Sequence, residues 1–271
     1  IKGFRDLGGI AGAAKGTGFT NNNVEGATIV ADQVTGYYAG KDINIHPILG
    51  NILEGERDSS NSQSDVELSV IVGSDATLSS ALTLKHVPTI LLAENAIIEG
   101  TFRPNHGVSI KSLNPEKKAM IKGRVNIDGY ADGIFFKDIK FDINEDSKVK
   151  KSFTGASYNY PGIVVIYASE ASFEGCEFKS DIATGVCGIN YGAHASNKLL
   201  KVNNCTFNGD FYAIRSRTLF SITNSTFNIH TDQGTLAAVF TWGNGAAGTQ
   251  NNGGANLVTF TGNKNINGNT S

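Results

Sequence analysis

The chain has 271 residues, a formal net charge of −2 and 18% charged residues. This composition excludes a disordered chain, and the absence of a basic block argues against nucleic acid as a partner. No apolar run reaches the roughly 18 residues that a membrane-spanning helix needs, so we expect no membrane span. Glycine, at 32 residues, suits a fold with a chain reversal every few residues.

Residues 1–65 differ in character from the rest of the chain. The run 8–14 consists mostly of Gly and Ala, and residues 55–65 are polar and charged, as in a loop or linker. We place a boundary at residue 65 and expect 1–65 to form an N-terminal arm or attachment segment in which short strands can occur. Residues 66–271 then form the main domain.

From Val66 onward, short apolar runs are separated by Gly, Asn, Asp and Ser, which indicates β-strands and turns. Residues 76–84 are an exception, because their apolar residues recur at helical spacing. We predict a capping helix there, since a solenoid needs an atypical terminal unit to cover its open end.

A repeated six-residue pattern is the strongest indication of the fold. Each copy has an apolar residue, a turn residue two positions later and Phe five positions later. The four copies cover 136–141, 173–178, 202–207 and 222–227 and start 37, 29 and 20 residues apart. A rung of a parallel β-helix takes about 20–25 residues, and longer intervals indicate loops inserted at a turn.

Two strands that meet at a tight bend explain this pattern. The turn residue of each copy can adopt the positive φ that the bend requires, and these residues are Asp138, Gly175, Asn204 and Asn224. Rungs stacked about 4.8 Å apart would make an internal aromatic ladder from the last residue of each copy. The ladder residues are Phe141, Phe178, Phe207 and Phe227. We also expect Asn204 and Asn224 to exchange amide hydrogen bonds.

The pattern therefore predicts an all-β fold, a right-handed parallel β-helix. A β-sandwich is the alternative, but its hairpin turns would place the Asn-Gly pairs between alternating strands, where they do not fall consistently. Cys176 and Cys205 occupy equivalent positions of two copies. We expect stacked buried thiols there, because in-register side chains point the same way and would strain a disulfide.

Three segments resemble the opening rungs of the pectate-lyase-like β-helix superfamily: 88–102, 108–112 and 119–123. The later copies of the repeat resemble the F-x-N-C-x-F rungs of the same group, so the resemblance covers about 66–230. It implies the fold. The superfamily includes polysaccharide lyases, glycoside hydrolases, phage tailspikes and adhesins, so it does not fix an activity.

Catalytic candidates are few. The N-T-D, D-D, G-H-G and R-I-K motifs of the hydrolases in that superfamily do not occur. The lyases use an Arg base beside acidic calcium ligands. The resemblance makes Arg215 and Arg217 the nearest bases, and the nearest acids are Asp128, Asp132 and Asp138. A structural role for these acids is favoured, because Asp is common in turns.

Asp142, Asn144 and Asp146 have the D-x-N-x-D spacing of a calcium loop. Ser147 replaces the glycine of such a loop and Phe153 replaces its final glutamate, so a solvated loop is favoured over a calcium site. We expect no cofactor other than this weak calcium candidate.

Tyr167, Tyr191, Arg215 and Trp242 are spaced by 24, 24 and 27 residues, close to one per rung. Aromatic and Arg side chains in a row suit sugar rings, so we consider a glycan-binding column. The competing interpretation is that they fill the core, because each follows an apolar residue at i−2, which points the same way in a strand.

We therefore predict an extracellular, cell-surface or virion protein with a structural or adhesive role. It would bind a polysaccharide or cell-surface glycan through a lateral face and associate as a homo-trimer or larger assembly. The alternative is a polysaccharide lyase or glycoside hydrolase.

Overall fold

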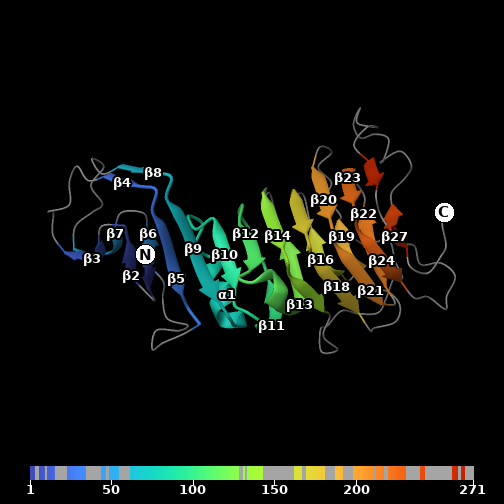
Figure 1. Ribbon diagram of the computed structural model, residues 1–271, viewed down its shortest axis with the longest axis horizontal. Helices are drawn as coiled ribbons and strands as arrows, with labels where there is room; N and C mark the ends of the chain where they lie inside the picture. Colours follow the sequence, from blue (N-terminus) through green and yellow to red (C-terminus); the bar gives the residue numbers. More distant parts are fainter. Residues whose placement is uncertain are drawn as a thin grey trace.

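A computed structural model describes residues 1–3, 6–9, 11–15, 23–34, 44–46, 49–54, 62–127, 131, 133–142, 162–166, 169–180, 187–191, 198–209, 211–216, 219–229, 239–241, 258–261 and 264–265. The strands lie side by side in one long stack, from the blue N-terminal strands to the orange C-terminal ones (Figure 1). All strand pairs are parallel, and strands adjacent in a sheet come from successive turns of the chain. The predicted parallel β-helix is confirmed.

The first sheet has ten strands, one from each rung. In order they are β1 (Lys2–Gly3), β5 (Thr28–Asp32), β9 (Glu67–Val72), β10 (Thr89–Leu92), β12 (Ser109–Ser112), β14 (Ile134–Lys137), β17 (Ala171–Glu174), β20 (Leu199–Asn203), β23 (Leu219–Thr223) and β26 (Val258–Thr261).

The second sheet has eleven strands and divides at a long strand, β13 (Met120–Ile127), which pairs with β11 (Ile97–Phe102). The start of β13 pairs with β15 and its end pairs with β16, so the next four rungs have three described strands each. One arm contains β15 (Lys140–Asp142), β18 (Glu177–Ser180), β21 (Thr206–Gly209), β24 (Thr226–Ile229) and β27 (Lys264–Asn265). The other contains β16 (Gly162–Ile166), β19 (Cys187–Tyr191), β22 (Tyr212–Ser216) and β25 (Val239–Thr241).

The stack continues across the boundary that we placed at residue 65, because β5 pairs with β9. Upstream of that boundary, three two-stranded parallel sheets accompany β1 and β5. Their strands are β2 (Asp6–Gly8) with β6 (Asn44–His46), β3 (Ala11–Lys15) with β7 (Leu49–Glu54), and β4 (Asn23–Glu25) with β8 (Ser62–Ser64). Residues 1–65 therefore contribute two rungs to the solenoid, where we expected a separate arm.

The predicted helix is present as α1 (Asp75–Ala81). Ser74 caps its N-terminus, where the Ser74 side chain accepts a hydrogen bond from the backbone N–H of Thr77 and the Thr77 hydroxyl accepts one from the Ser74 N–H. The helix follows β9, which is the third strand of the first sheet, so α1 lies within the stack and does not cover its first rung. A short 3₁₀-helix, η1 (Pro115–Lys117), precedes β13.

The predicted corner between the first and second sheets is confirmed in all four copies of the repeat. The turn residues have φ values of 55° at Asp138, 62° at Gly175, 53° at Asn204 and 52° at Asn224. Asn and Asp tolerate this left-handed region better than other side chains, and Gly has no Cβ to oppose it. The corner is only two residues long, and it therefore fixes the register of the two sheets.

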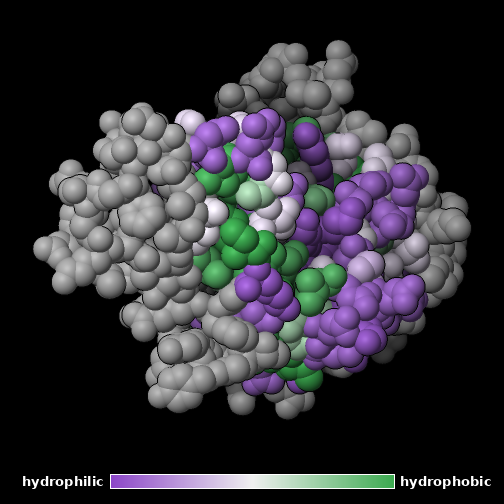
Figure 2. Space-filling view, turned by 60° about the vertical axis from the view of Figure 1, so that its left-hand side comes forward, coloured by the Kyte–Doolittle hydropathy of each residue, from purple (hydrophilic) through white to green (hydrophobic). Residues whose placement is uncertain are grey.

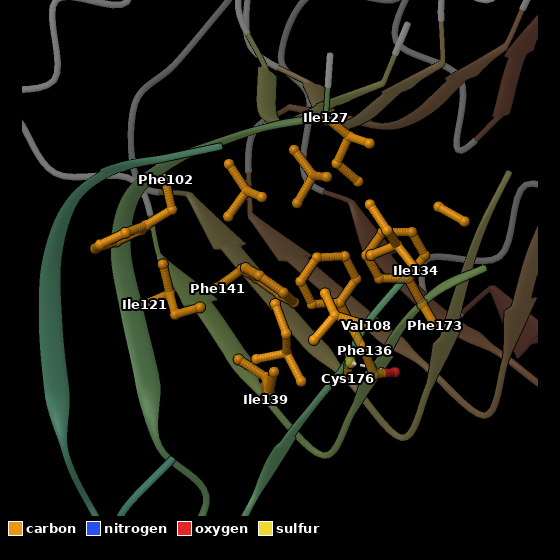
Figure 3. Packing of buried hydrophobic residues seen from close by; sticks show 14 of the residues in the cluster. Phe102, Val108, Ile121, Ile127, Ile134, Phe136, Ile139, Phe141, Phe173 and Cys176 are labelled. Atoms are coloured by element: carbon orange, nitrogen blue, oxygen red, sulfur yellow. Dashed lines mark hydrogen bonds between the residues drawn. The ribbon is translucent and has the colours of Figure 1, made fainter. Parts of the chain in front are cut away.

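The core is a set of in-register columns, of which the Phe ladder is one. Ring centroids lie 4.9 Å apart for Phe141 and Phe178, 4.6 Å for Phe178 and Phe207, and 5.1 Å for Phe207 and Phe227, with interplanar angles of 4–14°. Figure 3 shows Phe141 pointing toward Phe136 and Phe173 of the first sheet. The predicted ladder is therefore confirmed, and a second stacked pair, Phe136 and Phe173, lies beside it.

Candidate functional site

The outer face of the first sheet has one regular pattern over six neighbouring strands. In β10, β12, β14, β17, β20 and β23, the inward residues are buried and the residues between them are partly or fully exposed. We call these outward residues the first-sheet wall: Thr89, Leu91, Ser109, Lys111, Phe135, Lys137, Ser172, Glu174, Lys201, Asn203, Ser221 and Thr223.

Strand register arranges the wall in two columns along the stack. The first column runs through the residues that pair successively from Thr89 to Ser221, and most of them carry hydroxyl groups. The second column runs two residues further along each strand, from Leu91 to Thr223. Neighbours within a column are about 4.8 Å apart, and the columns are about 7 Å apart.

Phe135 is an aromatic residue in this polar wall. It is partly exposed, whereas its neighbours Ile134 and Phe136 are buried. In its column, Ser109 and Ser172 lie on the strands to either side. A partly exposed ring flanked by hydroxyl groups combines a stacking surface with hydrogen-bonding groups, which is the chemistry that a sugar ring requires.

Ion pairs and amides link neighbouring strands of the second column. Lys137 Nζ lies 2.7 Å from Glu174 Oε1, and this hydrogen bond raises the pKa of Lys137. Further along, the Asn203 side-chain oxygen accepts hydrogen bonds from Thr223 Oγ1 at 2.9 Å and Asn224 Nδ2 at 3.1 Å. The expected amide exchange between rungs therefore uses Asn203 with Asn224, because Asn203 points outward in β20.

The outer face of the second sheet alternates in charge. Glu99, Lys122, Asp142 and Lys179 are successive in-register neighbours, and Lys122 Nζ lies 3.7 Å from Glu99 Oε1. Asp142, the first calcium candidate, thus lies between two lysines in its column. Asn144 and Asp146 lie outside the described residues. Within the described part of the chain, no group of three or more His, Cys, Asp or Glu residues could hold a metal ion.

The expected glycan-binding column is not in register at Tyr191 and Arg215. Tyr191 pairs with Ser216, and Arg215 pairs with Asn190, so the two side chains alternate between faces. Tyr191 is fully buried and its hydroxyl donates to the Ser169 carbonyl oxygen at 3.1 Å, which places it in the core. Tyr167 and Trp242 lie outside the described residues.

Arg215 is only 3% exposed. Its Nη1 donates to Asn190 Oδ1 at 3.3 Å, and Asn190 is also 3% exposed. A guanidinium in this position links β22 to β19 and is not presented to a polymer in solution. Three of the other weak catalytic candidates, Arg217, Asp128 and Asp132, lie outside the described residues.

The three cysteines are free and buried. The predicted reduced state of Cys176 and Cys205 is confirmed, and both thiols donate within their own turns, to the Glu174 carbonyl at 3.5 Å and the Asn203 carbonyl at 3.3 Å. Burial raises the pKa of the Cys176 thiol well above its ordinary value, and the hydrogen bond with Cys205 raises it further. These groups act as core residues.

Phe135 is not among the predicted site residues, because the repeat pattern begins at its buried neighbour Phe136. Strand parity would have found it, since Phe135 has the opposite parity to both Ile134 and Phe136. An aromatic residue on the polar side of a strand is the informative exception.

None of the described helices is long and apolar enough to cross a membrane. Comparison of the chain with protein-family models, with curated proteins and with solved structures finds no match.

Proposed function

We propose that this chain is a structural or adhesive β-helix of an extracellular surface or a virion, and that it binds glycans along the first-sheet wall. Residue patterns that resemble the pectate-lyase-like superfamily, with its tailspikes and adhesins, support this proposal. The ladders between rungs also support it, because a stack held by repeated core and backbone contacts makes a stiff rod. The observation that carries the proposal is the outward ring of Phe135 between Ser109 and Ser172.

The wall suits a polymer better than a compact ligand. Its pattern repeats along six successive described strands, and the repeat follows the stack axis. Hydroxyl groups on adjacent strands can hydrogen-bond to successive sugar hydroxyls, and Phe135 can stack on the apolar face of one ring. A glycan chain would then lie along the rod.

The alternative function, a polysaccharide lyase or hydrolase, has less support. Its base candidates are Arg215 and Arg217, of which Arg217 lies outside the described residues and Arg215 is 3% exposed and hydrogen-bonded to Asn190. A buried and hydrogen-bonded guanidinium favours a structural role for Arg215.

A glycan array tests the proposal with a matched pair of double variants. Ser109→Val with Ser172→Val removes the two hydroxyls beside Phe135 and keeps residues that favour strands. Thr206→Val with Thr226→Val removes two in-register hydroxyls from the outer face of the second sheet and serves as the control.

We expect the wild-type chain to bind a subset of glycans. The wall variant should bind those glycans about tenfold more weakly, because two hydrogen bonds are lost. The control variant should bind as the wild type does. No glycan binding by the wild-type chain, or equal losses in the two variants, would overturn the proposal.

A further inference from the structure

The first-sheet wall carries a pair of like charges that the second sheet avoids. Lys111 and Lys137 are in-register neighbours on β12 and β14, so their side chains emerge about 4.8 Å apart. Glu174 on the next strand pairs with Lys137 at 2.7 Å. Within the described part of the chain, Lys111 has no ion-pair partner.

Adjacent like charges in a sheet are destabilising. The second sheet of the same molecule places opposite charges next to one another, as with Glu99 and Lys122 or Lys140 and Glu177. The wall instead places Lys111 beside Lys137, whose ammonium already pairs with Glu174 and interacts electrostatically with the Asp138 carboxylate at the corner. Lys111 therefore carries the positive charge of this cluster that has no ion-pair partner in the described part of the chain.

Lys111 and Lys137 lie beside the partly exposed aromatic ring of Phe135. Lys137 lies on β14, two residues after Phe135. Lys111 lies on the adjacent strand β12, directly beside Lys137. Three strands and two columns therefore form a grid. Its six members are Ser109, Lys111, Phe135, Lys137, Ser172 and Glu174.

We propose that this grid binds a pyranoside that carries an anionic group, a carboxylate or a sulfate. The sugar ring stacks on Phe135, the anionic group lies against Lys111 and Lys137, and the serine hydroxyls bond to ring hydroxyls. The anionic group supplies Lys111 with a counter-charge, which offsets the repulsion between the two lysines. This inference rests on the proposed function and adds the class of glycan.

Four probes test the inference by calorimetric titration: an oligogalacturonate, its full methyl ester, a sulfated dextran oligosaccharide and the unsulfated dextran oligosaccharide. The methyl ester and the unsulfated dextran keep the sugar and remove the charge. Lys111→Met removes the unpaired ammonium and keeps its length. Lys122→Met makes the same change on the second sheet, beside Glu99, and is the matched control.

We expect at least one charged probe to bind more tightly than its neutral counterpart, and the difference should shrink as salt is added. Lys111→Met should weaken binding of that charged probe about fivefold, the usual effect of one exposed ion pair, and leave the neutral probes unchanged. Lys122→Met should change nothing. The carboxylate and sulfate arms identify which anionic group the grid prefers.

The two proposals fail in different ways. If glycans bind the wall and the serine variant abolishes that binding, but charged and neutral probes bind equally or Lys111→Met has no effect, the anionic inference is overturned and the glycan proposal stands. If no glycan binds the wild-type chain, both are overturned. Phe135→Leu keeps an apolar side chain and removes the ring, and unchanged affinity for a bound probe would also overturn the grid.

Discussion

The inner and outer faces of the second sheet differ in how residues of successive rungs are matched: the inner face repeats one residue type, and the outer face alternates charge. A parallel in-register sheet places equivalent residues of successive rungs next to each other. On the inner face of one arm the chain repeats one residue, and Phe178 stacks on Phe207 at 4.6 Å. On the outer face it alternates charge, as from Lys122 to Asp142 to Lys179. Identical neighbours stabilise a column of rings and destabilise a column of charges.

The largest expected loss of stability comes from a substitution that interrupts the inner column of stacked Phe rings. Phe207→Ala should lower the free energy of unfolding by about 3–5 kcal/mol, because Phe207 is fully buried and stacks on rings above and below. Urea unfolding followed by circular dichroism measures the loss.

Phe135→Ala on the outer face is the control for this change. It removes the same side chain from a partly exposed position, so we expect a change of about 0.5 kcal/mol. Similar losses in the two variants would contradict the assignment of the two faces.

A smaller effect concerns the pH dependence of stability that the buried thiol of Cys187 causes. Burial raises the pKa of Cys187 to about 12, from an ordinary value near 9. Below pH 9 the thiol is protonated in both the folded and the unfolded chain. As the pH rises from 9 toward 12, only the unfolded chain loses the proton, so stability should fall by about 1.4 kcal/mol per pH unit from this group.

Cys187→Ala separates this contribution from other alkaline effects. The variant should be less stable at neutral pH but should lose stability less steeply between pH 9 and 12, as measured by thermal unfolding across that range. Parallel curves for the variant and the wild type would show that the thiol does not remain protonated in the folded chain.

The smallest expected effect concerns the outer face. Lys137→Glu replaces the ion pair with Glu174 by two adjacent carboxylates, and the new carboxylate beside Lys111 offsets part of this loss. The net cost should be about 1 kcal/mol or less, since the side chains of Lys137 and Glu174 are about 40% exposed. Glu174→Lys in the same chain restores opposite charges and should recover most of the loss. A double variant less stable than Lys137→Glu would contradict a pairwise interaction, and urea denaturation provides the comparison.

The sequence was sufficient to predict the corner and the ladder. Both lie within six residues, so inserted loops cannot disturb their spacing, and Asn204 and Phe207 keep a fixed relation through the bend. The positive φ at the turn residue and the inward Phe then follow from local chemistry.

The lateral columns could not be predicted in the same way. We aligned Tyr191 with Arg215 at a spacing of 24 residues, whereas the register pairs Asn190 with Arg215, a spacing of 25. A slip of one residue moves a side chain to the opposite face of a strand. Such an error cannot be detected from sequence when the residues between two strands include a loop of unknown length.

The first two rungs were missed for another reason. β1 and β5 belong to rungs without the Phe repeat, and β1 has only two residues. Only pairing between distant segments, as of Val30 with Ser69, reveals that they extend the first sheet.

Thr89 pairs in register with Ser109, and Lys201 pairs in register with Ser221, so the wall repeats at a fixed spacing along the stack. Each pair spans 20 residues of chain but advances the molecule by only about 4.8 Å. A polymer that lies along the wall would therefore contact equivalent rows of side chains at this constant spacing. In the proposed glycan complex, adding or removing one such rung would change the number of sugar-contacting rows by one, so the number of rungs would set the valency.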